Sequence, residues 1–557
     1  MIEDFREGSG PFRHEADLCI IGAGPAGITI ANAFVGSRHR ICLIESGGLT
    51  CETESQALAE GSSIGHPGLH PAHSRLRVYG GSCRMWGGGC MPLSPYDFEP
   101  RDWIPYSGWP IGSGELEPWY NRARDVCGLQ RQALVDGAFR ARPRRFRIGG
   151  ETDAVVDRVF AQSPVEFGRT SLPMFANAPN VHVLLHANLL ELHADPAGGH
   201  VGEARIGALG GRRGSVRARY YVLAGGGIEN ARLLLLSDSQ VPCGLGNSRG
   251  LVGRFFQDHP RCRLGVLMQG RLDSLLRTYG HLTGAEAYPE LCLSENAQRT
   301  HRMLGCRARP YAVHAPPSPG VQALRDLRAY LVRPRREMEE GTQVEREVAG
   351  VLDRDLPTPL PPPDPQAVRP VRAALMAGRH AGDVATGLAR RLQGGSHLQR
   401  EQVEVMGYFE QAPNPDSRVR LCEQRDALGQ RRVQVDMRLT TLDHATHRSA
   451  AQLFGEDLAR ACGSRFQPDP WLADPEGRPN MHGTAHHIGT TRMSDSPRDG
   501  VVNRDCGVHD VENLYVAGSS VFPTGGWAFP TFTIVALGLR LADHLRSRLE
   551  KPASLVA

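Results

Sequence analysis

The order of apolar and polar residues predicts a β-α-β unit near the start of the chain. An apolar run at 17–21 precedes a glycine-rich turn at 22–27, and apolar residues then recur with helical spacing from 28 to 34. This order predicts a strand, a tight turn and a helix. A second β-branched run, at 40–44, ends at Glu45. The segment has the size of one β-α-β unit.

A second strand that runs into glycines occurs far along the chain. Residues 220–224 are apolar, 225–227 are all glycine, and a helix that carries 233–236 follows. The last apolar stretch, 530–544, has helical spacing, and Pro530 suits the first turn of a helix. The pattern of strands, glycine turns and helices predicts an α/β fold.

The middle of the chain, from about 260 to 480, has fewer glycine turns and less regular segments, which predicts a second domain that carries substrate specificity. Residues 357–370 are rich in proline and follow a charged helical stretch at 335–347. This composition predicts a surface insertion with a stiff, extended hinge. A solvated loop is the expected outcome, and a mobile lid is the alternative.

Composition narrows the class of protein. The 557 residues include 40% hydrophobic and 22% charged residues, which is ordinary globular usage. A net charge of +4 predicts no strong field for nucleic acid or a membrane surface. The 13 cysteines form no C-x-x-C pair, so neither a zinc site nor a disulfide framework is indicated. With no signal peptide and no apolar run of membrane-span length, we expect a soluble, cytoplasmic protein.

The first glycine turn has the spacing of a dinucleotide-binding motif. Gly22, Gly24 and Gly27 form G-x-G-x-x-G between a strand and a helix, and Glu45 follows 23 positions after Gly22 at the end of the next strand. Gly22 permits the tight turn, Gly24 lets the backbone approach a pyrophosphate, and Gly27 allows close packing of helix on strand. Glu45 would accept hydrogen bonds from a ribose diol.

Further motifs along nearly the whole chain make it resemble the glucose-methanol-choline (GMC) flavin oxidoreductases. Besides the first glycine turn, the matching segments are 80–87, 222–237, 251–260, 486–493, 500–502, 513–523 and the terminal helix. Four further segments look most like the branch that acts on sugars and glycosides: 97–98, 107–110, 414–418 and 426–429.

The resemblance implies a fold and a division into domains. We expect an α/β fold with a Rossmann-like FAD-binding domain of GMC type and a discontinuous α+β substrate-binding domain that contains an antiparallel sheet. Residues 1–260 are expected to form the first part of the FAD domain, 261–479 the substrate domain with its insertion near 330–400, and 480–557 the return to the FAD domain.

The resemblance also implies how FAD is held. The residues expected to bind it are Gly22, Gly24, Pro25, Ala26, Gly27, Glu45, Ser46, Gly81, Ser82, Met85, Trp86, Gly87, Gly88, Leu189, Ala224, Gly225, Gly518, Ser519, Pro530 and Thr531. In some relatives a histidine just before the tryptophan of the 80–88 loop bonds covalently to the flavin. Met85 stands there in this chain, so non-covalent FAD is predicted.

Alcohol oxidation needs a base that titrates near neutrality, and imidazole meets that need. The family pattern His-x-x-Gly-Thr maps onto 486–490, which makes His486 the candidate base and His487 the less favoured neighbour. Adjacent side chains diverge, and no carboxylate or cysteine partner stands at ligand spacing, so no metal site is expected. The N-terminus of the helix that begins near Pro530 would favour negative charge on the flavin ring.

One position departs from the family. The residue before Pro530 is usually Asn or His, which holds the substrate oxygen, and this chain has Phe529. An aromatic ring cannot supply that hydrogen bond. Either His486 acts alone, or a nearby polar group such as His487 substitutes, or the alcohol chemistry is altered or lost.

The predicted function is FAD-dependent oxidation of an alcohol of a sugar, aminosugar or glycoside. One specific case is oxidation of a primary hydroxyl to an aldehyde in an aminoglycoside-type antibiotic. The alternatives are a lyase that needs FAD without redox chemistry and a ligand-binding flavoprotein. The electron acceptor is left open among oxygen, a quinone and a redox protein, and no nucleic-acid partner or membrane span is expected.

Overall fold

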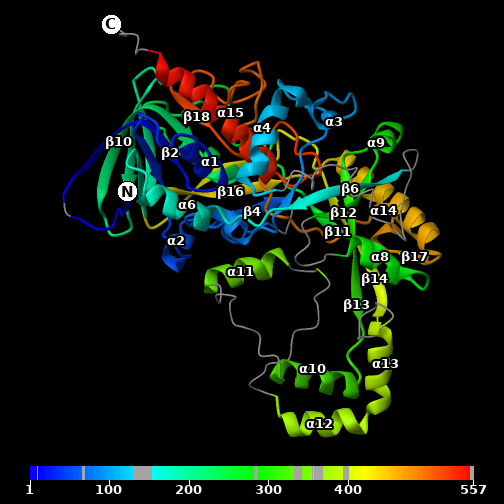
Figure 1. Cartoon of the computed structure of the whole chain (residues 1–557). Helices are drawn as coiled ribbons and strands as arrows, with labels where there is room; N and C mark the ends of the chain where they lie inside the picture. Colours follow the sequence, from blue (N-terminus) through cyan, green and yellow to red (C-terminus); the bar gives the residue numbers. More distant parts are fainter. Residues whose placement is uncertain are drawn as a thin grey trace.

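The computed structural model shows a body built on two large sheets and a helical lobe that projects from it (Figure 1). It describes residues 1–8, 10–65, 69–129, 154–280, 287–331, 342–353, 356, 368–392 and 400–551. Within these ranges no helix is long and apolar enough to cross a membrane. The predicted proline-rich hinge lies almost entirely outside the described residues.

The first sheet has eight strands, and its centre is parallel. In spatial order the strands are β1 (Ile2–Asp4), β7 (Val181–Leu185), β3 (Ile41–Ile44), β2 (Phe12–Ile21), β10 (Arg213–Leu223), β9 (Val201–Gly207) and β8 (Asn188–Ala194), with β18 (Leu514–Val516) also paired to β10. Since β2 and β10 run parallel, with Ile21 opposite Leu223, the two glycine turns that follow them lie at the same edge of the sheet.

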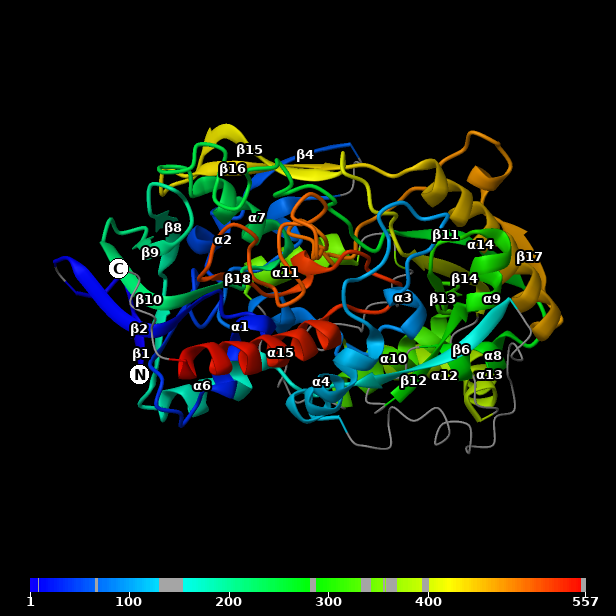
Figure 2. The same cartoon turned by 90° about the horizontal axis from the view of Figure 1, so that it is seen from above.

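Helices cover the first sheet on both faces, as its buried parallel strands require. They are α1 (Pro25–Ala33), α6 (Phe167–Ala176), α7 (Gly226–Leu236) and α15 (Thr531–Glu550). The terminal helix α15 packs against α1 and against α4 (Ser113–Val126), and Figure 2 shows it running alongside them. The predicted β-α-β unit, the second glycine turn and the terminal helix are confirmed, with Pro530 standing immediately before α15 rather than within it.

The second sheet is antiparallel throughout. In spatial order its strands are β17 (Arg465–Pro468), β11 (Arg261–Met268), β14 (Arg400–Phe409), β13 (Cys306–His314), β12 (Ala287–Leu293), β6 (Val155–Gln162) and β5 (Gly89–Cys90). Helices α8 (Leu272–Tyr279) and α14 (Thr441–Cys462) cover one face with an apolar core. The predicted α/β class with an additional antiparallel sheet is confirmed.

A third, three-stranded sheet contacts helix α7 through one of its strands. It joins β4 (Gly61–Gly65) to the hairpin β15 (Arg418–Arg425) and β16 (Arg431–Met437). The strand pairings therefore interleave the predicted domains: β5 and β6 join the antiparallel sheet although they precede residue 260. The proposed boundaries stay a prediction.

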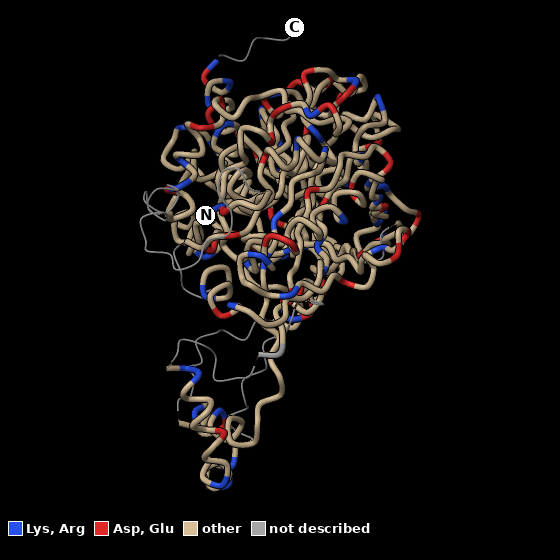
Figure 3. Tube along the Cα trace, turned by 90° about the vertical axis from the view of Figure 1, so that its right-hand side faces the viewer, with Lys and Arg blue, Asp and Glu red and all other residues tan. Residues whose placement is uncertain are grey.

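The smaller helices lie at the margins of the body. They are α2 (Thr53–Ala57), α3 (Pro95–Phe98), α9 (Glu295–His301) and α11 (Gln343–Leu352). The lobe consists of α10 (Pro319–Leu331), α12 (Pro370–Arg379) and α13 (Ala381–Leu392), which pack on one another beyond the ends of β13 and β14. Figure 3 shows this lobe standing clear of the rest of the chain.

Candidate active site

A cavity of about 490 Å³ lies between the carboxyl edge of the first sheet and the inner face of the second. Seventeen of the predicted cofactor residues line it: Gly22, Gly24, Pro25, Glu45, Ser46, Gly81, Ser82, Met85, Trp86, Gly87, Gly88, Leu189, Ala224, Gly225, Ser519, Pro530 and Thr531. Ala26, Gly27 and Gly518 are not among its lining residues. The predicted catalytic residues His486, His487 and Phe529 line the same cavity.

The first glycine turn is fixed by its contact with the end of β10. Gly22 has a φ of +110°, and a Cβ at this position would lie 2.6 Å from the carbonyl oxygen of Ala224. A Cβ at Gly27 would lie 1.9 Å from the carbonyl oxygen of Gly22, so the helix can sit on the turn only with glycine there. A Cβ at Gly24, in contrast, would meet no atom within 4 Å. Gly24 thus leaves its backbone open to a ligand in the cavity.

Glu45 is held at the end of β3 by backbone donors. Its carboxylate accepts from the N–H groups of Ala23 and Gly47, each at 2.9 Å, and burial raises its pKa above the ordinary value. Oε1 also accepts from Oγ of Ser46 at 3.2 Å, so Oε2 is the oxygen that keeps a further lone pair, and the side chain lines the cavity. This position suits the predicted role of Glu45, which is to accept hydrogen bonds from a ribose diol, and that role remains a prediction.

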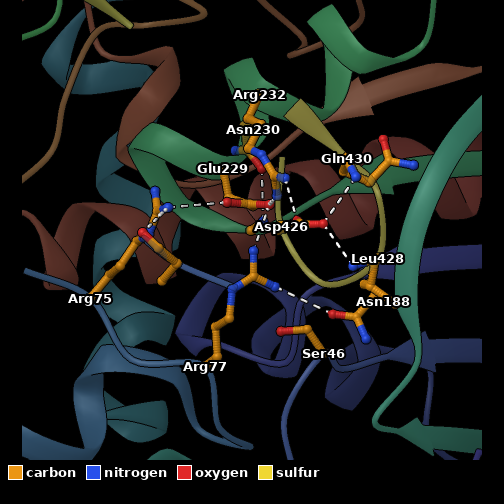
Figure 4. Close-up of polar contacts among 12 residues, drawn as sticks. Ser46, Arg75, Arg77, Asn188, Glu229, Asn230, Arg232, Asp426, Leu428 and Gln430 are labelled. Atoms are coloured by element: carbon orange, nitrogen blue, oxygen red, sulfur yellow. Dashed lines mark hydrogen bonds and ion pairs between the residues drawn. The ribbon is translucent and has the colours of Figure 1, made fainter. Parts of the chain in front are cut away.

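Sequence reasoning missed an arginine–carboxylate cluster at the cavity wall (Figure 4). Glu229 on α7 accepts from Arg77 at 2.8 Å and from Arg232 at 2.9 Å, and Arg232 also donates to Asp426 at 2.7 Å. Burial would raise the pKa of Glu229, but Arg77, Arg232 and Arg75 hold it well below the ordinary value. Among 63 arginines spread along the chain, no local pattern marks these three.

This wall fits the anionic part of a dinucleotide. Arg75 and Arg77 line the cavity, and buried donors of both, Nε and Nη1 of Arg75 and Nε of Arg77, have no hydrogen-bond partner among the described residues. Buried guanidinium donors that lack an acceptor are costly, and a phosphate oxygen would supply one. With the open backbone at Gly24 and the carboxylate of Glu45, the cavity offers the donor and acceptor set that FAD requires.

His486 lies at the other end of the cavity, against the second sheet. Its Nδ1 is 3.0 Å from Oγ1 of Thr484 and 2.9 Å from Nδ1 of His259. Thr484 Oγ1 also lies 3.0 Å from the carbonyl oxygen of His259, to which it donates. In the tautomer that carries its proton on Nδ1, His486 can donate to Thr484 or His259, and Nε2 is then the basic nitrogen. Burial, and then the charge of His259, lower the pKa of His486 well below 6.5.

A buried aspartate organises the segment around the histidine. Asp258 is fully buried and accepts from the backbone N–H groups of His259 (2.7 Å), His486 (2.9 Å) and Ala485 (3.2 Å). Burial would raise its pKa, but the neighbouring His487 and His486 and the backbone donors keep it below the ordinary value. Asp258 and His259 belong to the 251–260 segment of the resemblance, which carried no prediction of their contact with His486.

Phe529 cannot supply the hydrogen bond expected from Asn or His at this position, and His487 lies in a buried place beside His486. His487 is buried, and its desolvation lowers its pKa to about 4. The ring of Phe529 packs edge-on against His486, with centroids 5.5 Å apart, and edge-on against Phe160. The guanidinium of Arg307 lies over the ring of Phe529, 4.4 Å from its centroid. Phe529 therefore packs against both the candidate base and a buried arginine.

The described part of the chain holds no group of three or more His, Cys, Asp or Glu side chains placed for a metal ion. All 13 cysteines fall in the described ranges, and each is a free thiol.

The chain is similar in sequence to known oxidoreductases. Residues 413–538 match the family model described as GMC oxidoreductase. The chain is 25% identical over 96% of both proteins to a 2-methyl-1,2-propanediol dehydrogenase of Mycolicibacterium austroafricanum. It is 24% identical to a paromamine 6′-oxidase of Streptomyces fradiae, over 96% of this chain and 92% of the relative.

The structure also superposes on solved structures of other oxidases. A fungal aryl-alcohol oxidase superposes with a TM-score of 0.56 at 15% identity, over 97% of this chain and all of that one. A formate oxidase superposes with a TM-score of 0.54 over 97% of this chain and 99% of that one. Through its C-terminal family match and through relatives aligned over nearly the full length, the chain is similar to the GMC oxidoreductases, which depend on FAD.

Proposed function

We propose that this enzyme oxidises an alcohol group of a sugar or glycoside to a carbonyl, with His486 as the base. The observation that carries the proposal is the position of His486 in the FAD cavity, where Thr484 and His259 engage its Nδ1. In the proposed step the Nδ1–H tautomer reacts, and Nε2 takes the proton. When bound, FAD supplies the hydride acceptor. His486 takes the hydroxyl proton, and its lowered pKa keeps it in the basic form at neutral pH.

The substrate class rests on the named activities of relatives. Two of them are called paromamine 6′-oxidase and 6‴-hydroxyparomomycin C oxidase, and a third is called C-glycoside 3-oxidase. These names support sugars, aminosugars and glycosides as candidate substrates. Oxidation of a primary hydroxyl of an aminoglycoside is the specific case that the first two favour.

The cofactor is proposed to be held without a covalent bond. The residues that would hold it are the first glycine turn, Glu45, the 80–88 loop, and Arg75 and Arg77. Met85 lines the cavity at the position where some relatives carry the linking histidine, and a thioether forms no such link. Acid precipitation of the purified protein should release all the flavin into the supernatant. A yellow pellet would contradict this proposal.

The domain division is proposed on the strand pairings. β18 and α15 lie in the last 78 residues and return to the first sheet, which supports 480–557 as the closing part of the FAD domain. The antiparallel strands β11 to β14 and β17 support 261–479 as the body of the substrate domain.

The test is anaerobic mixing of the purified enzyme with a panel of sugars, glycosides and aminoglycosides. Bleaching of the oxidised flavin absorbance supports the proposed oxidation. Product without bleaching would indicate the lyase alternative, and no response to any alcohol would indicate a ligand-binding flavoprotein. Reoxidation by oxygen or by quinones then identifies the class of electron acceptor.

His486→Ala should lose flavin reduction by about 10²-fold or more and keep its FAD content, because a general base contributes about 10²–10⁴-fold. The exposed His301→Ala is the matched control. In the native enzyme the reduction rate should stay high as the pH falls below 6.5 and drop only when His486 protonates, since its pKa is lowered. Equal reduction rates in His486→Ala and the control would refute the assignment.

A further inference from the structure

The cavity face of the second sheet is charged, although the opposite face is an apolar core. Side chains alternate between the two faces of a strand. Leu291 on β12 and Cys306 and Ala308 on β13 join the apolar core under α8 and α14. Tyr288 and Glu290 on β12, and Arg307 and Arg309 on β13, therefore point to the other face, and Tyr288 and Arg309 line the cavity.

The charges on this face do not balance. Glu290 pairs with both arginines, and the side chains of Glu290, Arg307 and Arg309 are 1%, 4% and 14% exposed. The phenols of Tyr288, Tyr311 and Tyr408 also surround the two arginines, and the imidazoles of His259 and His486 lie near Arg307. Two guanidinium groups face one carboxylate, so this group carries a net charge of +1 in a poorly solvated place. Burial of an uncompensated charge is unfavourable, and an anionic ligand would relieve it.

Only one of the two arginines is open to a ligand. The guanidinium of Arg307 is enclosed between the rings of Tyr408, at 4.0 Å from the centroid, and Phe529, at 4.4 Å. Arg309 lies over Tyr288, 5.4 Å from its centroid, and reaches the cavity that also contains His486 and Phe529.

No lining carboxylate among the described residues would attract a cation beside His486. The cavity-lining carboxylates are Glu45, Glu229 and Asp426. Glu45 stands at the end of β3, and the other two are paired with Arg77 and Arg232 in the cluster that fits the cofactor. A cationic aminosugar would therefore meet Arg309 without a counter-charge at this end of the cavity.

We propose that Arg309 binds a carboxylate of the substrate, so that the enzyme acts on acidic sugars or on glycosides that carry a carboxylate. This inference rests on the proposed alcohol oxidation, and among its substrate classes it favours acidic sugars and glycosides over the aminoglycoside case. A guanidinium holds a planar carboxylate with two parallel hydrogen bonds, and one negative charge balances the surplus of +1. A doubly charged phosphate would overshoot that balance.

The first experiment measures flavin reduction on matched substrates. A trio of aryl glucosides carries a carboxylate, a carboxamide or an aminomethyl group on the ring, and a methyl glucuronide places the carboxylate on the sugar. The best carboxylated substrate should exceed the carboxamide in kcat/KM by about tenfold or more, and the aminomethyl compound should be the poorest. Equal values across the trio and the glucuronide would overturn the proposal.

Variants then assign the effect to Arg309. Arg309→Gln should reduce the carboxylate-to-carboxamide ratio of kcat/KM by about tenfold or more, and Arg309→Lys should retain part of it. Arg328→Gln, which removes one exposed charge from α10, should leave the ratio unchanged. Glu290 keeps Arg307 as a partner in both Arg309 variants, so the sheet retains an ion pair. An unchanged ratio in Arg309→Gln would refute the assignment.

A binding measurement separates this inference from the proposed function. Isothermal titration calorimetry of the holoenzyme should detect benzoate but not benzamide, and Arg309→Gln should abolish benzoate binding. If no alcohol reduces the flavin but benzoate binding depends on Arg309, the proposed oxidation fails and the anion site stands. If neutral sugars reduce the flavin and benzoate binding is absent or survives in Arg309→Gln, the anion site fails and the oxidation stands.

Discussion

Phe529 is the residue at which the candidate active site departs from the expected pattern. Its ring occupies the place where the resemblance leads us to expect Asn or His, and it contacts the imidazole of His486 on one side and Arg307 on the other. The cation over the ring and the edge-on contact to Phe160 fix its orientation. At this position the side chain therefore offers no hydrogen bond to a substrate, and it packs instead against the proposed base and a buried arginine.

Phe529→Asn tests whether packing or polarity matters at this position. We expect slower flavin reduction, by about tenfold or more, because the shorter side chain leaves space into which His486 can move and small displacements of a base are costly. The variant should also lose about 3 kcal/mol of unfolding free energy through the cavity it creates. Stopped-flow reduction and urea unfolding give the two values.

Phe529→Leu is the matched control, since it keeps an apolar side chain of intermediate size. It should lie between the native enzyme and Phe529→Asn in both measurements. Faster reduction in Phe529→Asn would show that the missing polar group limits the rate. An unchanged rate and affinity would show that Phe529 is irrelevant to the chemistry.

At the scale of elements, the sequence predicts what lies within one motif and misses what lies between motifs. The turn at Gly22 is predicted from glycines a few positions apart, Glu45 from its place 23 positions later at the end of the next strand, and His486 from a family pattern over 486–490. The contact of His486 with His259 spans 227 positions, and that of Arg232 with Asp426 spans 194. Such contacts depend on how sheets meet, and a local pattern carries no information about that.

The β15–β16 hairpin is the element whose role only the structure reveals. Its turn brings Asp426, Leu428 and Gln430 to the cavity wall, and Asp426 accepts from the backbone N–H groups of the other two, each at 2.9 Å. The side chains of Asp426 and its partner Arg232 are 2% and 5% exposed. The hairpin is therefore fastened to α7 by a buried ion pair beside the proposed cofactor site.

Asp426→Ala should weaken both the fold and FAD retention. Removal of one partner of a buried pair typically costs about 3–5 kcal/mol, and the lower part of that range applies because Arg232 keeps Glu229. Thermal unfolding and the FAD-to-protein ratio after gel filtration report the two effects. Glu423→Ala removes an exposed carboxylate from the same hairpin and should change neither. Full FAD retention in a destabilised Asp426→Ala would show that the hairpin supports the fold alone.

At the scale of the whole molecule, apolar exposure is concentrated on the helical lobe. Val371 and Leu375 on α12 are 73% and 69% exposed, and Leu388 and Leu392 on α13 are 45% and 89% exposed. Each pair is spaced four residues apart, so each forms a stripe on one side of its helix. The sequence indicates an insertion near 330–400, but the direction of these stripes depends on how α12 and α13 pack against α10. Contiguous exposed apolar surface promotes association of molecules.

Substitution of Val371, Leu375, Leu388 and Leu392 by serine should reduce self-association and leave catalysis nearly intact. The lobe stands beyond the ends of β13 and β14, and none of these four residues lines the cavity (Figure 1). Sedimentation velocity over a range of concentrations should show less oligomer, and kcat/KM should stay within about twofold, as for surface changes of small energetic effect. The control replaces Arg372 and Arg391, exposed on the same two helices, by serine. A fall in kcat/KM with an intact helix content by circular dichroism would contradict this prediction. It would show that the lobe takes part in turnover although it stands apart from the body.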